Sequence, residues 1–240
     1  MAWLTGLIYD LFFAFVVLAF WVGMTSGIAA AQEPARILAV GDSLMAWHLM
    51  TGKSIADVVG DELNEPTASR AVSAARMIFN VPGFAQMGMQ IPNQFSGDNW
   101  DWVLMNGGGN DLWFGCGCKA CDIKLDKLLD PDTGKGAIPD LITSARLTGA
   151  QVVWVGYLRS PGVDSLIEEC RDEGDALEAR ITEYVAGRDG VYFVSNADLV
   201  PHGDLSFHSV DRIHPSVKAS RAIGERVADV IRKNDKDRYT

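Results

Sequence analysis

Three short segments of the chain carry residue types suited to acyl transfer, and the first two supply a nucleophile and a base. Gly41-Asp42-Ser43 contains a serine hydroxyl, which is a weak nucleophile unless a base lies within hydrogen-bonding reach. Of the four histidines, only His214 has a carboxylate three residues before it, at Asp211. An aspartate at that spacing can hold the imidazole in one tautomer and stabilise its charged form. These residues therefore predict cleavage of an ester, or transfer of its acyl group, by a serine.

The third segment, Gly107-Gly108-Gly109-Asn110, could supply the hydrogen-bond donors that this chemistry needs. Negative charge develops on the carbonyl oxygen in the transition state, and each donor aimed at it is worth on the order of 3 kcal/mol. Glycines let the backbone approach a ligand closely, and the candidate donors are the amide of Asn110 and the backbone N–H of Ser43. Each segment alone is also explained as an ordinary turn or helix start, but their occurrence together favours a site.

The elements that must position these segments are strands alternating with helices. Apolar runs typical of buried strands occupy residues 36–40, 101–105, 151–155 and 191–194. Helical patterns occupy residues 54–63, 139–147, 166–185 and 215–231. The alternation predicts one α/β domain whose parallel sheet is covered on both faces. Sites in such sheets lie at the carboxyl ends of the strands, which is where the serine and asparagine segments fall.

The composition excludes several classes of protein. With 48% hydrophobic and 22% charged residues, the 240-residue chain is an ordinary globular protein rather than a disordered, collagen-like or coiled-coil one. Its formal net charge is −10. Because holding a phosphate backbone requires many lysines and arginines, we expect no nucleic-acid partner.

Residues 1–31 are expected to direct export, as a signal peptide or as an N-terminal membrane anchor. Residues 11–22 are twelve consecutive apolar residues, and Ala29-Ala30-Ala31 follows as a cleavage pattern before Gln32. The basic start of an ordinary signal peptide is missing, and the uncharged stretch 11–31 is 21 residues long, so an uncleaved anchor in contact with the membrane is the alternative. Both interpretations place residues 32–240 outside the cytoplasm, in the periplasm or in the medium.

The four cysteines are expected to form two disulfides in an exported protein: Cys116, Cys118, Cys121 and Cys170. Cysteines separated by one residue pair badly, which disfavours Cys116–Cys118. Cys170 then pairs with Cys116 or Cys118, if Cys121 takes the other. Such a bridge would hold the loop after Asn110 against the helix around Cys170 and stiffen one wall of the site. A four-thiolate zinc site is the alternative.

The motifs together resemble the SGNH (GDSL) hydrolase family. Residues 41–44 are similar to its first block, residues 108–111 to its third and residues 211–214 to its fifth. The second block normally carries a glycine, and the best match, residues 71–76, has Ala74 in its place. The resemblance covers residues 36–232. It implies a flavodoxin-like, three-layer α/β/α sandwich with a five-stranded parallel sheet, and no metal or organic cofactor.

The resemblance also implies a mechanism of ester hydrolysis through an acyl-serine intermediate. Ser43 would attack the carbonyl, His214 would take its proton and later activate water, and Asp211 would orient His214. The backbone N–H groups of Ser43 and Ala74 and the amide of Asn110 would form the oxyanion hole. Ala74 would then need a φ above zero, which strains any residue other than glycine.

The sequence leaves several functions open on these residues. The first is an exported serine esterase acting on small or carbohydrate-linked esters. The second is a lipase, lysophospholipase, acyltransferase or carbohydrate O-deacetylase, and the third is a non-catalytic binding domain. Large apolar residues near the motifs could line an acyl pocket or belong to the core. They are Trp47, Met50, Met77, Phe79, Phe84, Met87, Met89, Trp113 and Phe114.

Overall fold

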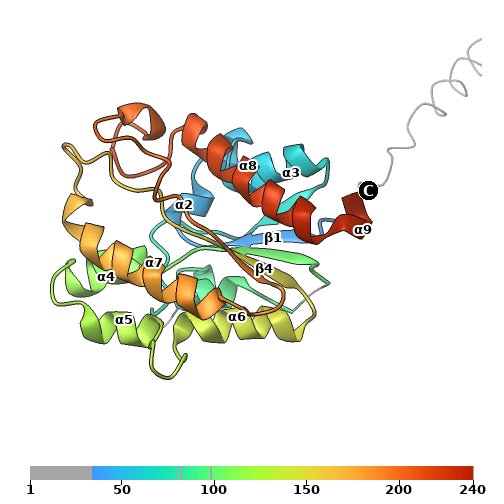
Figure 1. Cartoon of the computed structure of the whole chain (residues 1–240), viewed down its shortest axis with the longest axis horizontal. Helices are drawn as coiled ribbons and strands as arrows, with labels where there is room; N and C mark the ends of the chain where they lie inside the picture. Colours follow the sequence, from blue (N-terminus) through green and yellow to red (C-terminus); the bar gives the residue numbers. More distant parts are fainter. Residues whose placement is uncertain (1–33, 80, 82, 98, 240) are drawn as a thin grey trace, which may run out of the picture. The chain divides into compact units, whose positions relative to one another are not determined.

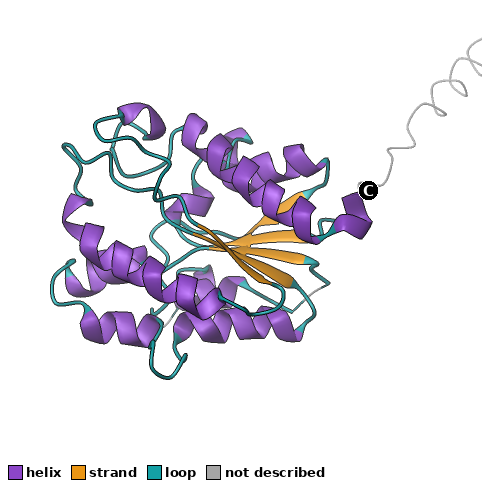
Figure 2. Cartoon of the chain, viewed as in Figure 1, coloured by secondary structure: helices purple, strands orange, loops and turns teal. Residues whose placement is uncertain are grey.

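The middle layer of the fold is a parallel sheet (Figure 2). The structure is a computed structural model that describes residues 34–79, 81, 83–97 and 99–239. Within them the sheet has five strands in the order β2-β1-β3-β4-β5, and every neighbouring pair is parallel. The strands are β1 (Ile37–Val40), β2 (Thr67–Ser69), β3 (Trp102–Met105), β4 (Gln151–Val155) and β5 (Val191–Val194). The five-stranded parallel sheet that the family resemblance implies is therefore confirmed.

Helices cover both faces of this sheet (Figure 1). Helices α3 (Ile55–Leu63) and α8 (Val217–Asn234) lie on one face. The other face is covered by α4 (Gly109–Cys116), α5 (Asp122–Leu128), α6 (Ala137–Leu147) and α7 (Arg171–Val185). The short helices are α2 (Ser43–Ala46), α9 (Lys236–Tyr239) and the 3-10 turns Leu49–Thr51, Ala85–Met87, Ile91–Gln94, Glu168–Cys170 and Leu205–Phe207. The result is a three-layer α/β/α sandwich.

The alternation of side chains along β1 shows how both faces become core. Ile37 and Ala39 pack in the cluster that contains α3 and α8, whereas Leu38 and Val40 pack in the cluster on the opposite face. All four residues are fully buried. A strand buried on both sides reads as an unbroken apolar run, which is why the sequence pattern predicts it.

The expected elements agree with the structure except at some helix ends. Helix α8 begins at Val217 rather than at Pro215, because the side chain of Ser216 caps it by accepting a hydrogen bond from the N–H of Ala219 at 3.3 Å. Helix α7 begins only at Arg171, because residues 168–170 form a tighter 3-10 turn. The sequence pattern did not predict β2, α4 or α5.

The expected export segment, residues 1–31, lies outside the described residues. From Ala35 onward the chain forms one compact unit. Among the residues that the structure describes, no helix has the length and apolar character required to span a membrane.

Candidate active site

Ser43 is the first residue of α2, in the turn that follows β1. The side chain of Gln94 holds this turn: its amide oxygen accepts from the N–H of Gly41 at 2.7 Å, and its amide nitrogen donates to the Gly41 carbonyl at 2.9 Å. The carboxylate of Asp42 caps α2 by accepting from the N–H of Leu44 at 3.0 Å. Ser43 thus lies at the carboxyl end of β1, in a turn whose backbone is held by the side chains of Gln94 and Asp42.

Asp211 and His214 lie in the loop before α8 and are joined by a short hydrogen bond. The distance from Asp211 Oδ2 to His214 Nδ1 is 2.7 Å, and the other carboxylate oxygen accepts from the N–H groups of Ile213 and His214, both at 3.0 Å. Partial burial would by itself raise the pKa of Asp211, but these hydrogen bonds outweigh it and lower the pKa. The carboxylate therefore stays charged and leaves Nε2 of His214 for proton transfer.

The indole of Trp47 covers one face of the His214 ring. The two rings are parallel within 6°, with their centroids 3.8 Å apart. The indole N–H donates to Ser209 Oγ at 2.9 Å, and the N–H of Ser209 in turn donates to the carbonyl of His214 at 2.8 Å. The imidazole is therefore held at its Nδ1 edge by Asp211 and across its face by Trp47.

The first turn of α4 holds the segment that carries Ala74. The amide nitrogen of Asn110 donates to the carbonyl of Ala75 at 3.0 Å, which leaves its second hydrogen available. The buried carboxylate of Asp111 accepts from the N–H groups of Met77 and Ile78 at 2.8 and 2.9 Å. Burial raises the pKa of Asp111 to about 6, although these two N–H groups act in the opposite direction.

Ala74 itself has the positive φ that the sequence motif led us to expect at this position. Its φ is 64°, in the left-handed region that costs a non-glycine residue roughly 1–2 kcal/mol. The expected strain at this position is therefore present. Ala74 is also exposed, and it lines the same cavity as Ser43.

One cavity of about 590 Å³ brings the expected site residues together. Ser43, Ala74, Asn110 and His214 all line it, and Asp211 lies behind His214 rather than on the cavity surface. Much of the remaining wall is apolar: Trp47, Leu112, Trp113, Phe114, Ile167 and Leu177. Of the large apolar residues expected near the site, only Trp47, Trp113 and Phe114 line this cavity. Met77 is core, whereas Met50 and Met87 are exposed at the surface.

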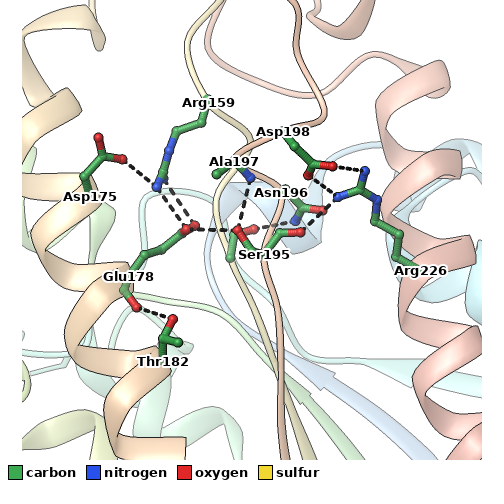
Figure 3. A network of polar contacts seen from close by, with 10 residues as sticks. Arg159, Asp175, Glu178, Thr182, Ser195, Asn196, Ala197, Asp198 and Arg226 are labelled. Carbon is green, nitrogen blue, oxygen red and sulfur yellow. Dashed lines mark hydrogen bonds and ion pairs between the residues drawn. The ribbon is translucent and has the colours of Figure 1, made fainter. Parts of the chain in front are cut away.

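Arg159 lines the cavity and belongs to a network of charged and polar side chains, which Figure 3 shows. Its guanidinium contacts Asp175 Oδ1 at 2.7 Å and binds both oxygens of the buried Glu178, at 2.9 and 3.2 Å. Glu178 also accepts from the hydroxyl of Ser195 at 3.2 Å, as Figure 3 shows. Burial raises the pKa of Glu178, and the adjacent Arg159 opposes this effect. Two carboxylates thus hold one guanidinium, which fixes Arg159 rather than leaving it mobile.

The structure pairs the four cysteines in one of the two ways left open by the sequence. Cys118 bonds to Cys170, with Cα atoms 4.8 Å apart, and Cys116 bonds to Cys121, with Cα atoms 5.5 Å apart. The first bridge joins the turn after α4 to the start of α7, and Cys170 lines the cavity. The bridges leave no thiolate for the alternative zinc site.

The model of the GDSL-like lipase/acylhydrolase family matches residues 39–222. The chain belongs to this family. As a member of the GDSL family it is a hydrolase that acts on ester bonds. No curated protein matches the chain by sequence.

Solved structures share the GDSL-family fold at low sequence identity. An inhibitor-bound aryl esterase from M. smegmatis is 16% identical with a TM-score of 0.59, over 83% of this chain and 99% of that one. A psychrotrophic esterase from Pseudoalteromonas sp. is 16% identical with a TM-score of 0.53, over 82% and 96%. A family two carbohydrate esterase from Clostridium thermocellum, in complex with cellohexaose, is 21% identical with a TM-score of 0.53, over 83% and 64%. At these identities the similarity concerns the fold alone.

Sequence reasoning missed several polar residues around this site in the GDSL-family chain, among them Gln94, Tyr157, Arg159 and Glu178. Tyr157 follows β4 by two residues, at the sheet edge that carries Ser43, so its position was a usable signal. Gln94 and Glu178 carry no comparable signal, because one lies in a 3-10 turn and the other in the middle of an amphipathic helix.

Proposed function

We propose that this GDSL-family protein hydrolyses small carboxylic esters through an acyl-serine intermediate. Ser43 is the nucleophile, His214 the general base and acid, and Asp211 the residue that orients it. The observation that carries the proposal is the shared cavity: Ser43, His214 and Asn110 line it together, and the Nδ1 atom of His214 is bonded to Asp211.

The proposed reaction has two balanced halves. Ser43 Oγ attacks the ester carbonyl while Nε2 of His214 takes the hydroxyl proton, and the leaving alcohol then receives that proton as the carbon–oxygen bond breaks. Water next attacks the acyl-serine and loses a proton to His214. His214 returns that proton to Ser43 Oγ as the acyl–oxygen bond breaks, which releases the carboxylic acid and restores the free serine. In both halves the carbonyl oxygen gains negative charge, which the N–H groups of Ser43 and Ala74 and the second amide hydrogen of Asn110 stabilise.

The cavity supports a substrate with an apolar group larger than acetyl. Its volume of about 590 Å³ is in the usual range for small-molecule sites, and its walls carry the indole of Trp113 and the ring of Phe114. We therefore favour esters with a medium-sized apolar acyl or alcohol group. A panel of p-nitrophenyl esters from acetate to decanoate tests this choice, and we expect the highest kcat/KM near butyrate or hexanoate.

The two disulfides support the proposal that residues 32–240 act outside the cytoplasm. Disulfides persist in oxidising compartments and are rare where thiol reductants are present. We propose that residues 1–31 direct this export, and fractionation of expressing cells followed by mass analysis of the N-terminus tests both the location and cleavage before Gln32.

A fluorophosphonate probe tests the catalytic assignment directly. We expect one covalent adduct, on Ser43, and none in Ser43→Ala. His214→Ala should slow labelling by several orders of magnitude, because nucleophile and base act as a unit. Ser144→Ala, which changes an exposed serine on α6, is the matched control and should label normally. An adduct that persists in Ser43→Ala, or a loss below tenfold in His214→Ala, would contradict the proposal.

A further inference from the structure

The hydroxyl of Tyr157 connects two parts of the site that are far apart in sequence. It donates a hydrogen bond to the carboxylate of Asp42 and accepts one from the backbone N–H of Gly109 at 2.8 Å. Asp42 directly precedes Ser43, and Gly109 directly precedes Asn110. The three partners follow β1, β3 and β4, so a single oxygen atom links the carboxyl ends of three neighbouring strands.

The direction of these hydrogen bonds follows from the donors present. A phenol has one proton, and the N–H of Gly109 can only donate, so the phenol proton must point to the carboxylate. Asp42 is 2% exposed, and its other oxygen accepts from the N–H of Leu44 inside the nucleophile turn. The carboxylate is therefore held between Tyr157 and the backbone of α2.

Gly109 makes room for the tyrosine ring. A Cβ atom at this position would lie 2.7 Å from Cζ of Tyr157, closer than such atoms approach in proteins. Any larger residue would displace either the ring or the first turn of α4. The position of the ring and the position of Asn110 are thus coupled by contact as well as by the hydrogen bond.

We propose that Tyr157 is a positioning residue that sets the spacing between two donors of the oxyanion hole, the N–H of Ser43 and the amide of Asn110. The proposal rests on the acyl-serine mechanism above. Donors stabilise an oxyanion only when they lie about 2.7–3.1 Å from it, and a misplacement of about 1 Å can cost on the order of 100-fold in rate. The hydroxyl of Tyr157 links the two segments that carry these donors.

The test removes this hydroxyl and keeps the ring. Tyr157→Phe should lower kcat for p-nitrophenyl butyrate by 10- to 100-fold and slow fluorophosphonate labelling by a similar factor, with KM changed less than about twofold. The matched control is Tyr192→Phe, which removes a hydroxyl that bonds to the side chain of Gln151 at 3.2 Å, away from the cavity. Its kcat should stay within twofold of the wild-type value.

Active-site titration separates positioning from loss of fold. Each kcat is obtained by dividing the maximal rate by the concentration of sites that finally label, so unfolded molecules do not contribute. Asp42→Asn weakens the same link at its other end, because it leaves one acceptor oxygen for two donors, the hydroxyl of Tyr157 and the N–H of Leu44. It provides a second variant, with the same expected pattern of lowered kcat and nearly constant KM.

Two failures are distinguishable. If wild-type Ser43 does not label, the proposed function fails. If wild type labels and kcat per titrated site is unchanged in Tyr157→Phe, or if only KM changes, the positioning role of Tyr157 is wrong while the proposed function stands.

Discussion

Seven non-glycine residues of the described chain have a left-handed backbone, and three of them lie in the segments around the proposed catalytic groups: Ala74 (φ 64°), Arg212 (φ 59°) and His48 (φ 66°). Arg212 lies between Asp211 and His214, and Ala74 borders the cavity. Such conformations cost of order 1–3 kcal/mol each and persist only when their surroundings determine them. The conformation of Ala74 is supported by three hydrogen bonds that hold residues 75–78. Asn110 donates one to Ala75, and Asp111 accepts the other two from Met77 and Ile78.

This strain makes Ala74→Gly an unusual substitution, one that should stabilise the protein. Glycine removes the left-handed penalty of roughly 1–2 kcal/mol and adds roughly 0.5–1 kcal/mol of chain entropy to the unfolded state. We expect the free energy of unfolding to rise by about 0.5–1 kcal/mol and activity to be retained, as measured by urea denaturation and ester hydrolysis. The same change in the exposed interior of α7, Ala179→Gly, should instead lower stability by about 0.5–1 kcal/mol. Equal losses at both positions would show that Ala74 is not strained.

At the scale of elements, the Cys118–Cys170 bridge determines how α4 and α7 meet beside the cavity. It closes a sequence separation of 52 residues, whereas Cys116–Cys121 closes one of 5. The chain-entropy relation gives about 4 kcal/mol for the long loop and about 2 kcal/mol for the short one. The two bridges are therefore expected to contribute different amounts to the free energy of unfolding, although three of their four cysteines lie within six residues of one another.

Removing each bridge separately should reveal this difference. The double substitution Cys118→Ser with Cys170→Ser should lower the free energy of unfolding by about 4 kcal/mol and reduce discrimination between long and short esters, because one cavity wall loses its link. Cys116→Ser with Cys121→Ser should cost about 2 kcal/mol and alter the ester preference less. Denaturation curves and the p-nitrophenyl ester panel measure both effects. A larger loss from the short bridge would refute this account.

The same scale shows what the sequence can predict. Strands β1, β3 and β4 are buried on both faces and β5 is partly buried. All four are unbroken apolar runs except for Gln151 at the start of β4, and their bounds were predicted within one residue. Strand β2 is only three residues long and half-buried, with the sequence Thr-Ala-Ser, so no pattern marks it. Helix α4 begins in a glycine-rich segment, and glycine is a poor helix former. The family resemblance supplied the fifth strand where periodicity could not.

At the site, the sequence predicted residues that belong to short local motifs but not contacts between residues far apart along the chain. Ser43, Asn110 and the Asp211–His214 pair were found because each belongs to a short local motif. The bond from Tyr157 to Asp42 joins residues 115 positions apart, and the indole of Trp47 meets His214 from the other end of the chain. Contacts of this kind follow from the packing of the sheet edge, which no local pattern describes.

For the whole molecule, the buried ionisable groups make stability depend on pH in opposite directions. His208 is 6% exposed, and burial lowers its pKa below the usual 6.5. Asp111 has its pKa raised to about 6 from 3.8, mainly by burial. As pH falls below about 6.5, the unfolded chain binds a proton at His208 more readily than the folded chain, so stability is lost. Between pH 6 and 4 the folded chain binds a proton at Asp111 more readily, so that group restores stability.

His208 also lies in a segment that is hydrogen-bonded to the segment around His214. The N–H of Ser209 bonds to the carbonyl of His214, and the N–H of Ser216 bonds to the carbonyl of Phe207, so the segment around His208 pairs with the segment that carries the proposed general base. We therefore expect a positive charge on His208 to weaken this pairing and to disturb the position of His214.

We therefore expect His208→Gln to flatten the acid side of the stability profile. Wild type should lose stability from pH 7 to 6 at a slope of up to about 1.4 kcal/mol per pH unit from this group, and the variant should not. The variant should also keep more of its neutral-pH activity after incubation at pH 5.5. Urea denaturation at half-unit steps from pH 5 to 8 measures the slope, with His202→Gln as the control for an exposed histidine of the same region. If wild type and His208→Gln lose stability in parallel below pH 6.5, His208 does not carry the acid sensitivity.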